Sequence, residues 1–306
     1  MTAEARLSAS AELPSLDAAP AVGAGGARRR LLRQLRRDPV ALVAAAILAA
    51  FVLTAAFAPL IAPDVAQGRG STKLAARDLP PSAEHVFGTD HLGRDLASRV
   101  VIGTRPALGS AAAVVLIAVL IGVPLGLASG YIGGLVDEGL MRLTDLFLSF
   151  PPLLLAMVIA ALLGPSLVHA VIALSISWWP WYARLARASA QSLRHEPFVD
   201  AARVYGMRTP AILARHVLRN ALTPIIVQAT VDAGTVILAI GSLSFLGLGS
   251  QPPLPDWGLM VSDGRTTVLT QWWVATFPGL AIFVVTLGFN LFGDALRDVL
   301  DPRATR

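Results

Sequence analysis

Long runs without a charged residue are the feature that most limits what this chain can fold into. Residues 40–63 and 106–136 contain no charged side chain, and about 20 apolar residues in a helix are enough to cross the hydrocarbon core of a membrane. A third uncharged run, 146–183, is too long for one helix and is divided by the sequence Gly164–Pro165–Ser166. We therefore expect an all-α, polytopic membrane protein. The six predicted transmembrane helices are 40–63, 106–136, 146–163, 167–187, 224–248 and 274–292.

The overall composition indicates the same class of protein. Of the 306 residues, 55% are hydrophobic and 15% are charged, and the mean hydropathy is +0.64. A soluble domain of this size needs more charge to cover its surface. The net charge of +5 does not indicate nucleic-acid binding, because the arginines cluster in short segments beside the apolar runs. Cysteine is absent, which excludes disulfide bonds, thiolate metal sites and a cysteine nucleophile.

The distribution of arginine predicts the orientation in the membrane. Residues 1–38 contain seven arginines and four acids, and residues 184–219 contain seven arginines and two acids. Residues 64–105, by contrast, contain six basic and five acidic side chains. Because positive charge collects on the cytoplasmic side, both arginine-rich segments and both termini are expected in the cytoplasm. The predicted organisation is a mostly disordered cytoplasmic tail (1–38), a first transmembrane helix (39–63), an extracytoplasmic loop (64–105), a transmembrane core of five helices (106–294) and a cytoplasmic tail (295–306).

The polar insert 195–219, between the fourth and fifth predicted spans, is expected to form two short helices. Pro197 suits the first turn of a helix. Four residues at helical spacing form its apolar face: Phe198, Ala201, Ala202 and Tyr205. Gly206 is expected to end this helix, and Thr209 to cap a second helix that begins at Pro210 and continues into the fifth span. The result is a cytoplasmic helix–turn–helix elbow, which either lies on lipid headgroups or docks onto another protein.

At this elbow the chain resembles a known family. The sequences DAARVYG (200–206) and HVLRN (216–220) resemble the EAA motif of ABC-transporter permease subunits. Asp200 stands where that family usually has glutamate, and Arg219 stands where it usually has the proline of a Leu-Pro pair. Four further segments resemble the C-type subunit of the dipeptide, oligopeptide and nickel permeases: 87–105, 145–151, 244–258 and 293–303.

The resemblance implies a function and a set of partners. It implies the permease subunit of an ABC importer for di- or oligopeptides in the plasma (inner) membrane, with nickel or another small solute as the alternative cargo. It also implies a second homologous permease, two cytoplasmic ATPase subunits and an extracytoplasmic substrate-binding protein. This sequence contains no GxxxxGK[ST] phosphate loop. We therefore expect ATP and Mg²⁺ on the partner ATPases, and neither a cofactor nor catalysis in this chain.

In this family the elbow seats in a groove of the ATPase. The resemblance therefore implies that Ala201, Ala202 and Gly206 lie at that contact. Phe198 and Tyr205 belong to the same predicted coupling surface. Asp200 is expected to stabilise the amino end of its helix or to pair with an arginine, rather than to act as a catalytic group.

Other residues in and beside the predicted spans have two possible roles each. Glycines recur at every fourth position along the second span and its cytoplasmic end: Gly122, Gly126, Gly130 and Gly134. Small residues at this spacing let helices approach closely, so we expect helix packing rather than contact with cargo. Asp232, in the fifth span, is costly in lipid; it either lines the translocation path or is hydrogen-bonded between helices. Arg142 and Asp145 are expected to form a local ion pair. The turn-rich residues 86–95 are expected to be ordered and to contact a partner permease or the binding protein.

Two other classes of membrane protein fit the sequence less well. An intramembrane serine protease needs a serine and a histidine on neighbouring spans, but His169 is the only histidine in a predicted span. A self-contained secondary transporter needs paired ionisable groups on broken helices, whereas Asp232 stands alone. His85 and His91 lack further ligands, so no metal site is expected.

Overall fold

The computed structural model describes residues 38–300, and this part of the chain is helical, as predicted. Its only strand-like pairing is an isolated bridge between Thr89 and Asp95. Residues 1–37 and 301–306 lie outside the described residues. They comprise the predicted disordered tail, apart from Asp38, and the last six residues of the predicted carboxyl-terminal tail. The helices are α2 (Pro39–Ile61), α3 (Val65–Gly68), η2 (Leu74–Ala76), α4 (Leu96–Ile132), α5 (Gly134–Leu148), α6 (Pro152–Leu163), α7 (Leu167–Leu193), α8 (Pro197–Val204), α9 (Thr209–Ile212), η3 (Leu213–Val217), α10 (Leu218–Phe245), α11 (Trp257–Gly264) and α12 (Trp272–Leu300).

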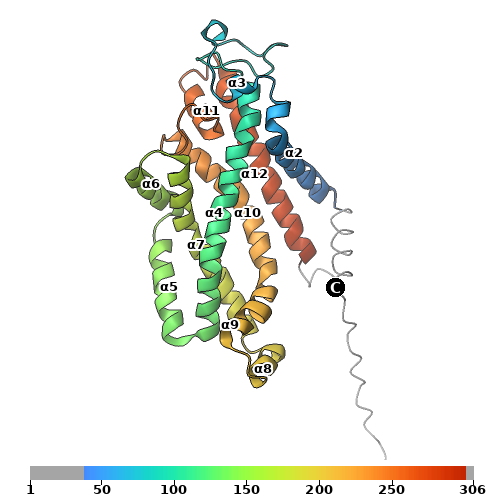
Figure 1. Cartoon of the computed structure of the whole chain (residues 1–306), viewed down its shortest axis with the longest axis vertical. Helices are drawn as coiled ribbons and strands as arrows, with labels where there is room; N and C mark the ends of the chain where they lie inside the picture. Colours follow the sequence, from blue (N-terminus) through green and yellow to red (C-terminus); the bar gives the residue numbers. More distant parts are fainter. Residues whose placement is uncertain (1–37, 301–306) are drawn as a thin grey trace, which may run out of the picture.

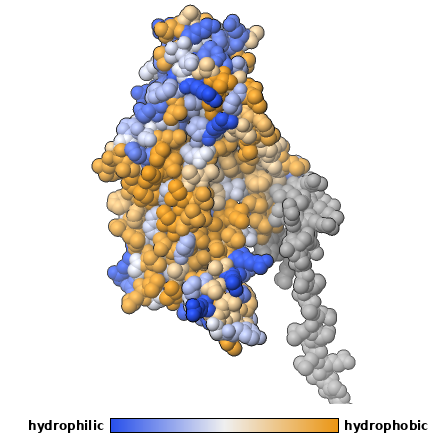
Figure 2. Space-filling view, viewed as in Figure 1, coloured by the Kyte–Doolittle hydropathy of each residue, from blue (hydrophilic) through white to orange (hydrophobic). Residues whose placement is uncertain are grey.

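The long helices run roughly along the longest axis of the molecule (Figure 1). The short helices α3 and α11 lie at one end, and α8 and α9 lie at the other. On the face drawn in Figure 2, an apolar belt lies across the middle and hydrophilic residues gather towards both ends. This distribution is the one expected of a chain whose middle faces lipid and whose ends face water.

Length and composition identify four membrane-spanning candidates among the described residues. They are α2, α4, the continuous helical segment Thr209–Phe245 and α12. A fifth is obtained if α5 and α6, which are bent by 82° relative to each other, count as one broken span. Helix α7 has 27 residues but carries Arg184 and Arg187 towards its end, and its composition does not meet the same criterion. The chain is therefore polytopic, with four or five spans by this measure.

The helix boundaries differ from the prediction at several places. Helix α4 begins at Leu96, inside the predicted loop 64–105, because the Asp95 side chain caps it by accepting from the Ser98 amide at 2.8 Å. The third predicted span, 146–163, is wrong as a single helix. It is broken before Pro152, since consecutive prolines remove backbone donors and exclude the helical conformation of the preceding residue. Helix α12 continues to Leu300, beyond the predicted end of the core at residue 294.

The predicted break at Gly164 is confirmed. Helix α6 ends at Leu163, Gly164 adopts a φ of +89°, and the Ser166 side chain accepts from the Val168 amide to begin α7. A positive φ costs a residue with a Cβ atom about 1–2 kcal/mol, which is why glycine suits this corner. Local backbone chemistry therefore positions the start of α7.

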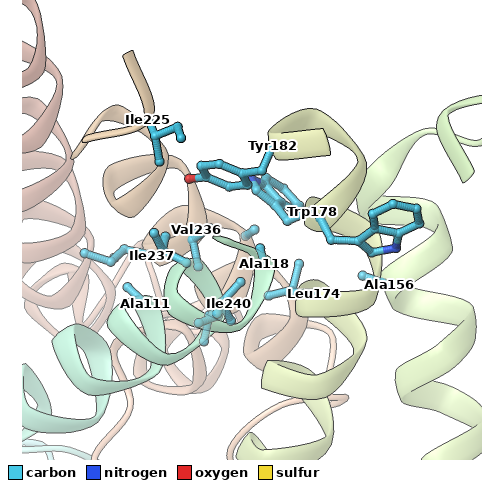
Figure 3. Packing of buried hydrophobic residues seen from close by; sticks show 14 of the residues in the cluster. Ala111, Ala118, Ala156, Leu174, Trp178, Tyr182, Ile225, Val236, Ile237 and Ile240 are labelled. Atoms are coloured by element: carbon cyan, nitrogen blue, oxygen red, sulfur yellow. The ribbon is translucent and has the colours of Figure 1, made fainter. Parts of the chain in front are cut away.

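The core lies where α4, α7 and α10 pack together, and it is shown in Figure 3. Small side chains from α4 meet large ones from α7 and β-branched ones from α10. The labelled members are Ala111, Ala118, Ala156, Leu174, Trp178, Tyr182, Ile225, Val236, Ile237 and Ile240. Close helix packing through small residues is the usual way in which membrane helices associate.

Three glycines form a seam between α4 and α7. A Cβ atom added at Gly122, Gly126 or Gly130 would fall less than 3.0 Å from a backbone carbonyl oxygen of α7. These oxygens belong to Trp179, Ala183 and Arg187, which are themselves four residues apart. The two helices therefore lie in backbone contact along the seam, and any larger residue at these three positions would force them apart.

Candidate functional site

The first helix of the elbow, α8, begins at Pro197 and ends in a Schellman motif. The Met207 amide donates to the Ala202 carbonyl at 3.0 Å, and the Gly206 amide donates to the Arg203 carbonyl at 2.9 Å. Gly206 has a φ of +74°, and no described atom lies within 4 Å of the place where its Cβ would be. Glycine is therefore needed here for its backbone conformation and not for close packing inside this chain.

The four residues of the predicted apolar face differ in their burial, because one of them faces the core and three face outwards. Val199 and Ala202 are buried in the core, whereas Phe198 and Ala201 are exposed. Tyr205 is 89% exposed. Val199 and Ala202, three residues apart, form the face of α8 that points into the core. Helical spacing alone could not show that this face, rather than the predicted one, is buried. The remaining exposed residues form what we call the outer face of α8: Phe198, Ala201, Val204 and Tyr205.

The second helix of the elbow runs without a break into the long helix α10. Helix α9 is followed by the π-helical turn η3 and then by α10. The prediction that Thr209 caps this helix is wrong. Arg208 occupies the N-cap position, and its side chain makes no capping hydrogen bond. Arg219 lies exposed in the first turn of α10. Since arginine keeps the backbone donor that a proline would lack, the helix continues through this position.

Arg203 ties α8 to the ends of two other helices. Its Nε donates to the Tyr131 hydroxyl oxygen at 3.0 Å, and its Nη2 donates to the Arg194 carbonyl oxygen at 3.0 Å. Its Nη1 donates to Asp200 at 2.9 Å, so Asp200 pairs with an arginine. The guanidinium also stacks over the Tyr131 ring, 5.1 Å from its centroid. The hydrogen bond with Tyr131 is the main cause that raises the pKa of Arg203.

Ion pairs at the same end of the molecule join α5 to α7. Arg187 donates to both carboxylate oxygens of Asp137, at 2.6 and 2.7 Å, and the Ser129 hydroxyl donates to the same carboxylate. The expected pair between Arg142 and Asp145 is not formed. Arg142 instead bonds Glu138 within α5, and Asp145 accepts from Arg184 of α7 at 2.7 Å. The spacing of residues within α5 gave no sign of this partner, because it lies 39 positions away.

Asp232 is buried in the middle of α10, where it faces protein. It is 8% exposed, and its Oδ1 accepts from the Gln228 amide nitrogen at 3.0 Å. The Gln228 donor is its side-chain Nε2, whereas the Asp232 Oδ2 and the Tyr182 hydroxyl have no hydrogen-bond partner among the described residues. Gln228 also lines a cavity of about 480 Å³ between α7, α10 and α12, together with Asp294 and Arg297. Polar groups thus reach from this cavity to the buried carboxylate.

The opposite end of the molecule carries a folded polar unit, which we call the cap (residues 64–95 and 249–264). Asp90 and Arg94 are buried, and the Arg94 Nε donates to the carboxylate at 2.6 Å. Asp95, also buried, bonds the Nδ1 of His85 at 3.0 Å while it begins α4. Residues 86–95 fold back on themselves, since the Asp90 amide donates to the Arg94 carbonyl at 3.1 Å. Charges that are this deeply buried are tolerated because each one is paired or hydrogen-bonded.

Two tryptophans bind the cap to the long helices. The Trp257 indole donates to the Val100 carbonyl at 3.0 Å, and the Trp273 indole donates to the Thr89 carbonyl at 3.1 Å. Asp256 caps α11 by accepting from the Leu259 amide, and burial raises the pKa of this carboxyl. The segments 87–105 and 244–258, which are far apart in the sequence, therefore meet in one structure. Among residues 38–300, no group of three or more potential ligands is arranged to hold a metal ion.

Comparisons with known proteins agree with this architecture. Residues 122–306 match the model of a family described as "binding-protein-dependent transport system inner membrane component", and residues 27–81 match the "N-terminal TM domain of oligopeptide transport permease C". The chain is 45% identical over 275 residues, 90% of its length and 91% of the relative's, to the probable D,D-dipeptide transport system permease protein DdpC of Escherichia coli strain K12. It is 45% identical over 90% of both chains to the dipeptide transport system permease protein DppC of Alkalihalophilus pseudofirmus.

Two further matches complete the comparison. The nickel transport system permease protein NikC of Escherichia coli strain K12 is 42% identical over 75% of this chain and 83% of the relative. An inward-facing structure of the MetNI methionine ABC transporter shares the fold, with a TM-score of 0.53 and 17% identity, over 66% of this chain and 97% of that chain. The chain therefore belongs to the binding-protein-dependent inner-membrane transport components, and within them to the permease subunits of the dipeptide, oligopeptide and nickel ABC importers.

Proposed function

We propose that this chain forms half of the translocation path of an ATP-driven importer for di- or oligopeptides. The observation that carries the proposal is the 45% identity, over 90% of this chain, to two permeases named for dipeptide transport. A second homologous permease would supply the other half of the path. An extracytoplasmic binding protein would deliver the cargo. Two cytoplasmic ATPases, rather than this chain, would bind the ATP and Mg²⁺.

We place this importer in the plasma (inner) membrane. The proposed topology of the chain has six spans, with both termini in the cytoplasm. The spans are α2, α4, the bent pair α5–α6, α7, the segment Thr209–Phe245 and α12. Arginine distribution supports this orientation, because Arg208, Arg215 and Arg219 lie exposed at the elbow end. The segment 64–105, which includes most of the cap, has by contrast six basic and five acidic side chains. An excess of lysine and arginine favours the cytoplasmic side of a membrane.

The proposed ATPase contact is the outer face of α8 together with Asp200 and Gly206, while Ala202, which is buried, would hold α8 against the core from the inside. Val204 and Tyr205, 87% and 89% exposed, present large apolar side chains at the end of the molecule. Gly206 has open space around it, so a partner surface can approach its backbone. A short helix joined to the spans can pass the movement of a motor on to them as a rigid body. Asp232, buried beside the cavity that Gln228 lines, is proposed to contribute to the translocation path.

The coupling surface can be tested with two matched glycines. Gly247 ends α10 in the same Schellman geometry as Gly206, with a φ of +80° and no described atom within 4 Å of the added Cβ. Gly206→Trp and Gly247→Trp therefore impose the same backbone strain at opposite ends of the molecule. We expect Gly206→Trp to lose the ATPases in an affinity pull-down from mild detergent and to keep the second permease.

The control variant should retain both partners. If both tryptophan variants retain the ATPases, the elbow is not the contact and the headgroup alternative stands. If the wild-type chain brings down no ATPase, the importer assembly proposed here is wrong.

Nickel is the second candidate cargo, and the 42% identity to a nickel permease supports it. The purified importer, reconstituted in vesicles with its binding protein, would be supplied with radiolabelled dipeptide or with ⁶³Ni²⁺. We expect ATP-dependent accumulation of the dipeptide alone. Accumulation of nickel without dipeptide uptake would replace the peptide assignment.

A further inference from the structure

We propose that Arg203 is the positioning residue that fixes the coupling helix α8 to the transmembrane pair α4–α7. The inference rests on the proposed function of α8 as the ATPase contact. It adds a side-chain route by which movement of α8 would reach the membrane. The backbone already joins α8 to two long helices, because residues 194–196 link it to α7 and because α9 and η3 continue into α10. No comparable continuous helix joins α8 to α4, so that connection must be made by side chains.

The three polar groups that Arg203 contacts belong to three different structural elements. Tyr131 lies in the last turn of α4, Arg194 is the residue that ends α7, and Asp200 lies on α8 itself. The last carbonyl groups of a helix have no partner within the helix, so the Arg194 carbonyl is free to accept from outside. A planar guanidinium carries several donors in a fixed fork and can hold all three groups at once.

The helices that Arg203 joins behave as a unit at this end. Gly130 of α4, the residue just before Tyr131, lies against the backbone of Arg187 on α7. Arg187 in turn holds Asp137 of α5 in a bidentate ion pair, and the Ser129 hydroxyl of α4 donates to the same carboxylate. A displacement of α8 that pulls on Tyr131 and the Arg194 carbonyl would therefore move α4 and α7 together.

Removing Arg203 should not unfold the elbow. Its side chain is 37% exposed, so no cavity is left behind. Val199 and Ala202 remain buried, and the Schellman motif at Gly206 uses only backbone groups. The expected result is an importer that binds its ATPases but transmits their movement poorly. Lysine cannot replace arginine here, because an ammonium group lacks the fork that bonds Tyr131 and Arg194 together.

The test is the number of ATP molecules hydrolysed for each peptide delivered, measured for the complete importer in vesicles. Arg203→Ala should retain the ATPases in a pull-down and raise this ratio roughly tenfold, the factor that corresponds to losing one hydrogen bond of ordinary strength. Arg203→Lys should raise it as well. Arg142→Ala is the matched control, since Arg142 is exposed and its described hydrogen bond lies within its own helix. It should leave the ratio unchanged.

A cross-link provides the rescue. The chain has no cysteine, so a variant with both Tyr131→Cys and Arg203→Cys carries a unique thiol pair. It should be uncoupled as prepared and should recover a near wild-type ratio after treatment with a short bismaleimide, which a general loss of structure would not do.

Three outcomes would overturn the inference in distinguishable ways. If Arg203→Ala keeps the ATPases and the wild-type ratio, the link does not transmit movement, and the ATPase contact of α8 is unaffected. If Arg203→Ala loses the ATPases, Arg203 belongs to the docking surface instead. If even the wild-type chain binds no ATPase, the proposed function fails together with the inference.

Discussion

At the cap, Asp90, Arg94 and Asp95 are 2–3% exposed and bond to neighbouring groups within the chain. At the other end of the molecule the exposure is reversed. Asp200 lies at the surface of α8, and Tyr205 is 89% exposed. Both regions lie towards the ends of the molecule, beyond its apolar middle (Figures 1 and 2). Each contains an arginine–carboxylate pair, but the pair in the cap is buried and the pair on α8 is partly exposed.

The cap satisfies its charged groups within the chain, whereas the outer face of α8 leaves large apolar side chains exposed. Buried, mutually bonded charges fix the cap, and removing one of them leaves the other uncompensated. Exposed apolar side chains add little to the stability of the isolated chain, and they gain free energy when another surface covers them. Substitutions in the cap should therefore change the free energy of unfolding, and substitutions on the outer face of α8 should change association.

The largest effect is expected at Asp90. Its carboxylate accepts from the Leu92 and Arg94 amides, both at 2.9 Å, and from the Arg94 Nε at 2.6 Å. Asp90→Ala leaves a buried guanidinium without its closest counter-charge, so we expect a loss of about 3–5 kcal/mol in the free energy of unfolding. Unfolding in mixed detergent micelles measures this. Glu138→Ala, which removes an exposed partner of Arg142, should change it by less than about 0.5 kcal/mol.

Equal effects of these two substitutions would contradict the description of the cap as a buried ionic unit. Binding of the ATPases to Asp90→Ala protein that has remained folded should be unchanged.

The next effect is expected at the seam that connects the two ends. A Cβ at Gly126 would overlap the backbone of Ala183, so Gly126→Ala should destabilise the chain by about 1–3 kcal/mol. Gly109 lies on the same helix with no described atom within 4 Å of an added Cβ. Gly109→Ala should therefore stabilise by roughly 0.5–1 kcal/mol, since it only removes glycine's freedom in the unfolded chain. The opposite signs, measured in the same unfolding experiment, separate close packing from helix propensity; the same sign at both positions would refute the seam.

The sequence could predict features that a few neighbouring residues determine. The helix ends at Gly164 and Gly206 both depend on a glycine with positive φ, and the surrounding residues are enough to indicate it. Apolar runs likewise indicate α2 and α12 well, because a span needs only length and the absence of charge. The corner between α5 and α6 also has a local signal in Pro151–Pro152, but the apolar run around it hides the break.

The sequence could not predict features that depend on distant partners. Charges in the segment 64–105 resemble those of an ordinary water-exposed loop, and their burial depends on groups such as Asp263, 3.7 Å from Arg94. The link from Arg203 to Tyr131 joins positions 72 apart. Helical spacing places Ala202 beside Phe198, but only the packing of Val199 decides which side of α8 faces inwards. These contacts are set by the assembled bundle.

A smaller loss of stability is expected at two glycines, Gly206 and Gly247, where only the backbone conformation is involved. The loss should be the same at both ends of the molecule. Gly206→Ala and Gly247→Ala each place a Cβ in open space at a positive φ, so each should cost about 1 kcal/mol in the free energy of unfolding. Amide hydrogen exchange in α8 and at the end of α10 would locate each loss. If Gly206→Ala has no effect while Gly247→Ala destabilises, the turn of the elbow does not hold the positive φ described here.

The smallest effect on stability is expected from the residue that should matter most for association. Tyr205→Ala removes an exposed ring and should change the free energy of unfolding by less than about 0.5 kcal/mol. Covered by a partner, the same ring becomes an aromatic anchor, and its loss should weaken ATPase binding roughly tenfold or more. Leu269, 96% exposed at the other end, is the matched control. Leu269→Ala should alter neither the unfolding free energy nor the affinity of the purified ATPase for the chain in nanodiscs. An unchanged affinity for Tyr205→Ala would mean that the exposure of the outer face of α8 has a different cause, such as contact with lipid headgroups.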